Sequence, residues 1–132
     1  MNRTIQAFLA LSIVAVLGLA VAFTGDGSPT GRMTAEELDS FAQCLTENNA
    51  TFYGAYWCPH CDTQKSMFGD AMEYVDYVEC WPGGRPRSRP PAKICQEKNI
   101  RSTPTWIIQG ERYTGVQTFK DLAKATGCSI PS

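Results

Sequence analysis

The sequence predicts an α/β fold in which a mixed four-stranded sheet is flanked by helices, and two observations lead to this prediction. Segments with helical periodicity alternate with short segments rich in aromatic and β-branched residues over residues 33–126, in the order αβαβαββα. The first two predicted strands are separated by a helix, which favours a parallel pair, whereas the last two are joined by a tight turn and should be antiparallel. Helices are expected on both faces of this sheet.

The first half of the domain is predicted to contain a helix, a strand and a second helix. Residues 34–48 begin with a capping-box sequence and continue with apolar residues at helical spacing. Residues 51–57 are rich in aromatic side chains, which is typical of a buried strand. The next helix is expected to begin at Cys58 or Pro59, because a proline suits the first helical turn, and Gly69 is expected to bend or end it.

The second half is predicted to contain a strand, a short helix, a hairpin and a final helix. A proline- and glycine-rich loop follows the strand, Gly110-Glu111 supplies the hairpin turn, and Thr118 supplies the cap of the last helix. The elements are expected at residues 74–80 (strand), 92–99 (helix), 105–109 and 112–114 (hairpin) and 118–126 (helix). The loop at 81–91 carries Arg85, Arg87 and Arg89, which we interpret as solvated, with docking of an acidic partner or anionic headgroups as the alternative.

Length, charge and cysteine content limit the class of protein. A chain of 132 residues has room for one domain of ordinary size. Its formal net charge of −1 shows no basic excess, so no nucleic-acid partner is expected. Six cysteines are a heavy load for a reducing compartment, and their even number suggests disulfide bridges.

The N-terminal residues 1–23 are predicted to be a transmembrane anchor or a signal peptide. After Arg3, residues 5–23 are uncharged and almost entirely apolar. This run exceeds the ~7 to 15 residues of a signal-peptide core, which favours a retained anchor, although Ala20-Val21-Ala22 offers small residues for cleavage. Because the positive end stays inside, the rest of the chain is expected outside the cytoplasm. We expect a single-pass protein of the cell membrane or, after cleavage, a secreted or periplasmic one.

The boundary of the folded domain follows from composition. Residues 24–32 are rich in glycine and lack apolar periodicity, which predicts a flexible linker. The domain itself is therefore placed at residues 33–132.

Cys58 and Cys61 form a C-x-x-C motif where the first strand passes into its helix. Such a motif beside a βαβ pattern is typical of the thioredoxin fold, and the predicted element order has the same layout. First-turn N–H groups and the helix dipole favour an anion at the N-terminal thiol. Cys58 is therefore expected to be the exposed, low-pKa nucleophile, and Cys61, one turn further in, the more buried resolving thiol.

The intervening Pro59 and His60 are expected to tune this pair. His60 is the single histidine of the chain and could place positive charge or a hydrogen-bond donor beside Cys58, which would make the disulfide more oxidising. An exposed imidazole without a role is the alternative. A haem site is excluded because Asp62 follows Cys61, but a zinc or copper site and a purely structural disulfide stay open as alternatives.

Three segments resemble the thioredoxin-like domain that is linked to bacterial vitamin K epoxide reductase homologues. They are Phe52-Tyr53-Gly54-Ala55-Tyr56-Trp57-Cys58-Pro59-His60-Cys61, Tyr77-Val78-Glu79-Cys80 and Thr103-Pro104-Thr105-Trp106. The similarity covers most of residues 34–128. DsbA-type oxidases also carry C-P-H-C, so the other segments are what favour the first family.

The resemblance implies that Cys58 and Cys61 pass electrons from client thiols to a quinone-linked membrane enzyme. Since this chain has at most one membrane span, that enzyme would act in trans. Expected clients are exported cysteine-containing proteins, and no metal or cofactor is expected beyond the redox-active disulfide. Thr103 and Pro104 match the cis-proline loop of thioredoxin folds, where the backbone of Thr103 could pair with a client strand. An oxidase is the leading hypothesis; a reductase or isomerase, and a metal-binding or interaction module, are the alternatives.

The other four cysteines allow three pairings, and the sequence alone does not choose among them. Cys80 ends the second predicted strand and Cys95 lies on the following short helix, so a bridge between them would restrain the loop that carries the arginines. Cys44 and Cys128 would then join the two ends of the domain. The resemblance supports the 80/95 pair more than the 44/128 pair. A second redox couple formed by Cys80 and Cys95 is an alternative.

Position 52 departs from the pattern of thioredoxin and DsbA. Those proteins place a carboxylate six residues before the first cysteine, where it helps to move the proton of the resolving thiol, and this chain has Phe52 there. Proton transfer at Cys61 is therefore expected to use water or another group.

Overall fold

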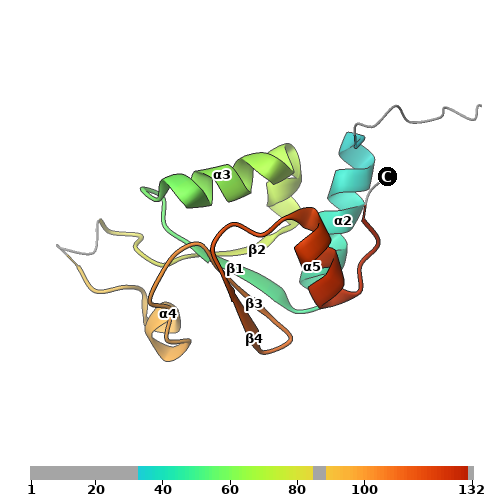
Figure 1. Cartoon of the computed structure of the whole chain (residues 1–132). Coiled ribbons are helices and arrows are strands. Elements are labelled where there is room, and N and C mark those ends of the chain that lie inside the picture. The colour runs from blue at the N-terminus through green and yellow to red at the C-terminus, as the bar shows by residue number, and fades with distance from the viewer. Residues whose placement is uncertain (1–32, 85–88, 131–132) are drawn as a thin grey trace, which may run out of the picture. The chain divides into compact units, whose positions relative to one another are not determined.

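The computed structural model describes residues 33–84 and 89–130 (Figure 1). The predicted anchor, the predicted linker and two of the loop arginines, Arg85 and Arg87, lie outside these residues. Within the described part of the chain, no helix is both long enough and apolar enough to cross a membrane.

A mixed sheet with strand order β2-β1-β3-β4 forms the centre of the domain. Its strands are β1 (Ala50–Gly54), β2 (Asp76–Glu79), β3 (Thr105–Ile108) and β4 (Glu111–Thr114). β1 pairs in parallel with β2 and antiparallel with β3, and β3 and β4 form the antiparallel hairpin. The predicted sheet is confirmed, and the α/β architecture is consistent with a thioredoxin-like fold.

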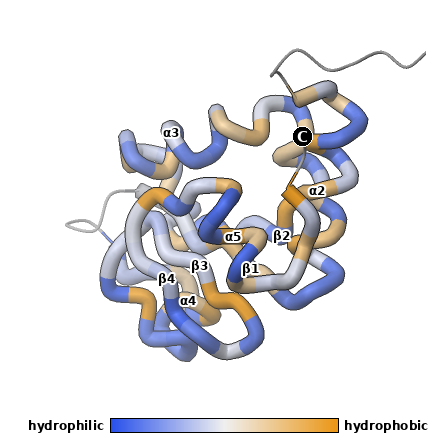
Figure 2. The backbone as a smooth tube through the Cα atoms, turned by 45° about the vertical axis from the view of Figure 1, so that its right-hand side comes forward, coloured by the Kyte–Doolittle hydropathy of each residue, from blue (hydrophilic) through white to orange (hydrophobic). Residues whose placement is uncertain are grey.

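Helices lie on both sides of this sheet, with α3 on one side and α4 on the other (Figure 1). The helical elements are α2 (Ala35–Glu47), α3 (Pro59–Phe68), the 3-10 helix η1 (Gly69–Tyr74), α4 (Lys93–Glu97) and α5 (Phe119–Thr126). Hydrophilic and hydrophobic residues alternate along α2 and α5 (Figure 2), as expected for helices with one buried face. Both helices begin with a complete capping box, at Thr34 and at Thr118.

Two predicted strands are shorter in the structure. The strand predicted at 51–57 ends at Gly54, because the N–H of Cys58 donates a hydrogen bond to the carbonyl of Ala55 and closes a turn before α3 begins. The strand predicted at 74–80 begins at Asp76, because η1 takes up the residues after Gly69. Gly69 ends α3 with a positive φ of 54°, a conformation that favours glycine.

Stacked aromatic rings fill the space between α3 and the sheet. The ring centroids of Phe52 and Trp106 are 5.0 Å apart, and Phe68 of α3 lies 6.1 Å from Trp106. Phe41 of α2 and Phe119 of α5 pack edge-on against each other at 5.4 Å. This core anchors α3, and with it the C-x-x-C motif at its N-terminus, to β1 and β3.

Two disulfides tie the periphery to the core. One joins Cys44 of α2 to Cys128 after α5, and the other joins Cys80 after β2 to Cys95 of α4. They are the two pairs that the sequence analysis favoured. Cys80 and Cys95 are fully buried, and burial disfavours exchange with outside thiols, so the geometry speaks against a second redox couple.

Candidate active site

Cys58 and Cys61 are free thiols at the N-terminus of α3. Cys58 is the N-cap residue, and its Sγ accepts a hydrogen bond of 3.3 Å from the N–H of Cys61. Pro59 occupies the first turn, where it removes no intrahelical hydrogen bond. The sulfur of Cys58 therefore takes the place that a capping oxygen takes in other helices, with the positive end of the helix dipole directed at it.

The pKa of Cys58 is lowered, although burial by itself would raise it. The effect of burial is outweighed by hydrogen bonds that lower the pKa. They come from the side chains of Cys61 and Thr103 and from the backbone N–H groups of Cys61 and His60. A group whose anion accepts several hydrogen bonds favours its ionised form. Cys58 is thus set up as the thiolate of the pair.

The pKa of Cys61 moves in the opposite direction, to about 12. Burial is the main cause, and the hydrogen bond that its thiol shares with Cys58 adds to it, while the backbone amide of Ala55 and the side chain of Thr103 act against it. Cys61 therefore stays a thiol at neutral pH, whereas Cys58 ionises more readily than an ordinary cysteine, which is the asymmetry expected of a resolving thiol and a nucleophile.

The predicted exposure of Cys58 needs correction. Its exposed fraction is 5%, against 0% for Cys61, so the order is as expected but neither sulfur is truly exposed. The turn at residues 55–58 and the neighbouring Thr103 cover Cys58. A client thiol must therefore reach the small part of Cys58 that stays exposed.

The Thr103–Pro104 segment lies against this pair. The peptide bond between the two residues is cis, and the thiol of Cys58 donates a hydrogen bond of 3.4 Å to the Thr103 carbonyl. Pro104 is fully buried, and its carbonyl accepts a hydrogen bond from the N–H of Gly115. The structure thus brings together the redox pair and the loop that were singled out 45 residues apart.

His60 affects the pair through its backbone. Its imidazole is exposed, and the contribution that lowers the pKa of Cys58 is a hydrogen bond from its main-chain N–H. Within the described residues, no group of three histidine, cysteine or acidic side chains is arranged to hold a metal ion.

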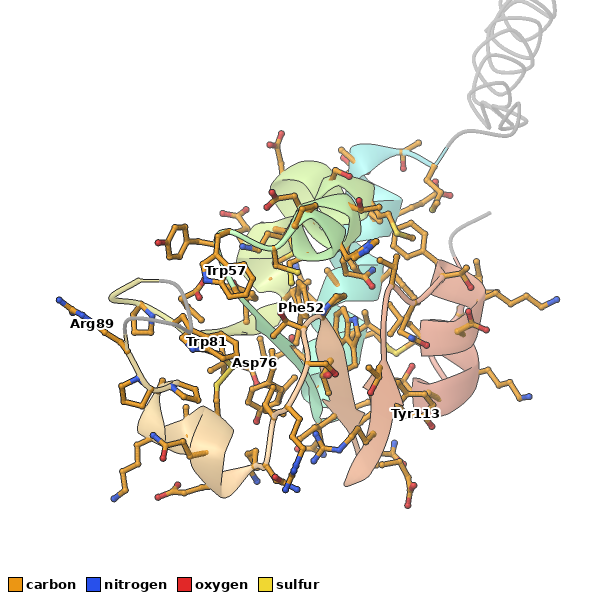
Figure 3. All side chains as sticks on the ribbon, turned by 60° about the vertical axis from the view of Figure 1, so that its left-hand side comes forward. Phe52, Trp57, Asp76, Trp81, Arg89 and Tyr113 are labelled. Carbon is orange, nitrogen blue, oxygen red and sulfur yellow. A yellow bond between two sulfur atoms is a disulfide. The ribbon has the colours of Figure 1, made fainter. Side chains whose placement is uncertain are left out.

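Aromatic side chains that the motif analysis did not single out precede the redox motif or pack against those that do. Tyr56 is 55% exposed beside the motif, and the rings of Trp57 and Trp81 pack with their centroids 5.7 Å apart (Figure 3). Trp81 follows the Y-V-E-C segment, and this position next to a matched segment was the available signal for it. The loop arginine Arg89, in contrast, is exposed to solvent.

A polar pair lies on β2, beneath α3. The hydroxyl of Tyr77 donates a hydrogen bond of 2.7 Å to Oε2 of Glu79, and Oε1 of Glu79 accepts one of 3.0 Å from the N–H of Trp81. Phe52, at the position of the missing carboxylate, is fully buried between the rings of Tyr77 and Trp106. Both polar residues belong to a segment that carried the family resemblance, but no sequence pattern indicated that Tyr77 meets Lys65 of α3.

Comparison with known proteins supports the chemistry that this geometry suggests. No protein-family model matches the chain. The chain is 39% identical over 92 residues to the thiol-disulfide oxidoreductase LTO1 of Arabidopsis thaliana. The match covers 69% of this chain and 24% of that protein, so the chain spans about a quarter of the relative's length. The chain is therefore similar to one part of a protein named as a thiol-disulfide oxidoreductase.

Proposed function

We propose that this chain is a thiol-disulfide oxidoreductase that acts on protein thiols outside the cytoplasm, with Cys58 as nucleophile and Cys61 as resolving thiol. The observation that carries the proposal is the opposite shift of two neighbouring thiols: the pKa of Cys58 is lowered by hydrogen bonds despite burial, and that of Cys61 is raised by burial. A purely structural disulfide has no need of this asymmetry. The similarity to a thiol-disulfide oxidoreductase adds support.

The oxidising reaction proceeds in two exchanges. A client thiolate attacks Sγ of Cys58 in the 58/61 disulfide, a client–Cys58 bond forms, and Cys61 leaves as a thiolate that takes up a proton. A second client thiolate then attacks the client sulfur of this mixed disulfide and releases Cys58 as a thiolate. The client gains one disulfide, and the 58/61 pair has accepted two electrons and become the dithiol. No further cofactor is needed for these steps.

The loop beside Cys58 is suited to hold the client. Pro59 and the Thr103–Pro104 segment border the Cys58 sulfur, and an extended client segment that pairs with the backbone of Thr103 would bring its own cysteine to that sulfur. The exposed ring of Tyr56 offers an apolar contact next to this path. Client selection would therefore rest mainly on backbone pairing.

An oxidase is the direction we favour. A stabilised Cys58 thiolate favours the dithiol and makes the disulfide a stronger oxidant. The resemblance to the domain linked to vitamin K epoxide reductase homologues supports a quinone-linked membrane enzyme in trans as the acceptor of the electrons. Two structural disulfides and the N-terminal apolar segment support a location outside the cytoplasm, at the membrane or free of it after cleavage.

The test compares two single-cysteine variants in cells. Cys61→Ala removes the resolving thiol, so adducts of Cys58 with exported cysteine-containing proteins and with a multi-span membrane protein should accumulate. Cys58→Ala should give few adducts, because its remaining thiol is buried and its pKa is raised to about 12. The adduct levels of both variants are measured by quenching the cells in acid, alkylating the free thiols and separating the extracts by electrophoresis without reductant.

The same experiment separates the proposal from other functions. A metal-binding module or an inert disulfide has no reason to trap clients asymmetrically. Equal adduct patterns from the two variants, or none from either, would overturn the catalytic assignment.

A further inference from the structure

The register of β1 and β2 places a polar pair on the face of the sheet that α3 covers. Phe52 pairs with Tyr77 and Gly54 pairs with Glu79 across the parallel strands. Paired and alternate residues share a face, so Tyr77 and Glu79 lie on the same side as Phe52. That side carries the aromatic core beneath α3, the helix that bears the redox pair.

Tyr77 is held tightly in this place. Its ring lies over Gly54 so closely that a Cβ there would come within 2.7 Å of Cε2 and 3.0 Å of the hydroxyl, so a larger residue at position 54 would displace the ring. Its ring packs edge-on against Phe52 at 5.1 Å, and Nζ of Lys65 lies 4.1 Å from the ring centroid. The hydroxyl donates its proton to Oε2 of Glu79 at 2.7 Å.

Three observations place this hydroxyl on the side of the sheet that faces the resolving thiol. A Cβ at Gly54 would lie 3.0 Å from the Tyr77 hydroxyl, and the backbone amide of the next residue, Ala55, hydrogen-bonds the thiol of Cys61. Lys65 lies one helical turn after Cys61 on the same face of α3. Burial and the hydrogen bond to Glu79 raise the pKa of Tyr77, and the charges of Cys61 and Cys58 raise it further, so its hydroxyl stays protonated.

The proposed function creates a need for such a group in the reverse of the first exchange, in which Cys61 resolves the mixed disulfide on Cys58 and releases the client unoxidised. When Cys61 attacks a mixed disulfide on Cys58, it must first lose a proton, and burial holds its pKa at about 12. Phe52 provides no base at the position where thioredoxin carries a carboxylate. The titratable and charged groups around the Tyr77 hydroxyl are Glu79 on β2, Lys65 and Cys61 on α3, and Cys58 at the start of α3.

We infer that Glu79, acting through the hydroxyl of Tyr77, accepts the proton of Cys61 during resolution. A water molecule carries the thiol proton to the hydroxyl, and the hydroxyl passes its own proton to the Glu79 carboxylate, to which it is hydrogen-bonded. The Cys61 thiolate forms a bond with Sγ of Cys58, the bond from Cys58 to the client breaks, and the client leaves as a thiolate that is protonated by solvent. Tyr77 is thus a relay, and Glu79 is a positioning residue and the proton acceptor. The inference rests on the proposed function and deepens it.

The test measures resolution separately from attack. The full chain, kept in detergent and reduced at the 58/61 pair, is mixed with oxidised glutathione and quenched in acid, and mass spectrometry follows the Cys58–glutathione adduct. In Glu79→Gln and Tyr77→Phe, the adduct should form at the wild-type rate but decay roughly tenfold more slowly near neutral pH, less than the ~100-fold or more typical of direct general bases. The difference should shrink as pH rises, because solvent then removes the proton.

Asp76→Asn is the matched control, since it neutralises a carboxylate on the same strand but on the opposite face, where Asp76 accepts a hydrogen bond from Thr51. It should leave both rates unchanged. The relay would be refuted if the adduct decayed at the wild-type rate in both test variants, or if the decay rate fell by the same factor at every pH. Either result would leave the proposed function intact. If oxidised glutathione gives the wild type neither an adduct on Cys58 nor a 58/61 disulfide, the proposed function itself fails, and the relay with it.

Discussion

At the scale of single residues, two chemically identical side chains acquire opposite properties within one helical turn. The sulfur of Cys58 caps α3 and accepts the N–H of Cys61, whereas Cys61 lies inside the turn beside Ala55. The capping position turns free backbone N–H groups toward one sulfur, and burial withdraws solvent from the other. Thr103, from a distant loop, reaches both thiols.

Thr103→Val should test how much of the lowered pKa of Cys58 depends on the loop that carries Thr103. Valine keeps the shape of threonine but lacks the hydroxyl that helps to lower the pKa of Cys58. The pKa of Cys58 should therefore rise, the thiolate fraction at a given pH below it should fall, and alkylation should become slower there. The pH profile of Cys58 alkylation by iodoacetamide measures the shift.

Thr63→Val provides the comparison for that substitution. The hydroxyl of Thr63 lies on α3, close in sequence to the redox pair, but donates to the carbonyl of Pro59. Its profile should coincide with that of the wild type. An unchanged profile for Thr103→Val would show that the backbone of α3 alone stabilises the thiolate.

At the scale of elements, one buried amide links α3 by hydrogen bonds to two other parts of the domain. Gln64 is fully buried, and its Oε1 accepts hydrogen bonds from the indole N–H of Trp106, at 3.2 Å, and from the N–H of Gln117, at 2.7 Å. Its Nε2 donates to the carbonyl of Gln117 at 3.1 Å. The redox helix, β3 and the connection to α5 therefore share one polar centre.

Replacing Gln64 by leucine should destabilise the domain strongly. Leucine fills a similar volume but leaves the indole of Trp106 and both backbone groups of Gln117 buried without partners, at about 1–3 kcal/mol each. Because some of these groups can relax toward solvent, we expect the free energy of unfolding to fall by roughly 2–4 kcal/mol. Urea unfolding followed by tryptophan fluorescence measures this change.

Gln96→Leu is the control on an exposed helix face, where the amide donates to the carbonyl of Pro91. This variant should change the free energy of unfolding by less than about 1 kcal/mol. A Gln64→Leu variant as stable as this control would mean that the buried amide has no special role in holding α3.

At the scale of the whole molecule, the structural bridges leave the redox pair free to change state. The Cys44–Cys128 bridge closes a separation of 84 residues and the Cys80–Cys95 bridge one of 15. Closing longer loops removes more entropy from the unfolded chain, about 3 kcal/mol for the shorter and about 4.5 kcal/mol for the longer bridge. The domain therefore keeps its constraints whether the 58/61 pair is a dithiol or a disulfide.

The oxidase proposal makes a prediction about the stability of the two redox states. Because the pKa of Cys58 is lowered in the folded dithiol, its thiolate adds stability above the unfolded pKa of ~8.5, and this stability is lost as pH falls through the folded pKa. At neutral pH Cys61 is protonated both folded and unfolded, so it does not cancel this effect. The reduced protein should unfold at higher urea concentration than the oxidised one near pH 7.5, and the difference should shrink near pH 4.

The reduction potential of the 58/61 couple measures the same difference in stability between the reduced and the oxidised protein. It should lie above the value of about −270 mV found for thioredoxin, in the direction of the roughly −120 mV of DsbA. A potential near that of thioredoxin, together with equal stability of the two states, would favour a reductase.

Much of the fold could be predicted from local sequence, because the deciding interactions lie within a few residues of each other. The capping sequence at Thr34, the proline after Cys58 and the turn at Gly110 indicate where helices and hairpin begin, and the periodicity between them indicates the order of elements. The C-x-x-C motif at a helix N-terminus likewise follows from adjacent residues. The lengths of the strands could not be predicted, because the turn before α3 and the helix η1 compete with strand pairing for the same residues.

The rest of the site depends on contacts between distant parts of the chain. Thr103 meets Cys58 across 45 residues and Gln64 meets Gln117 across 53, and no local pattern encodes such a meeting. The burial of Cys58 and the place of Tyr77 beside α3 also arise only when β1, β2 and the loop before β3 close around the motif. Local propensity selects each element and its caps, whereas the joint packing of one core decides which side chains reach the two sulfurs.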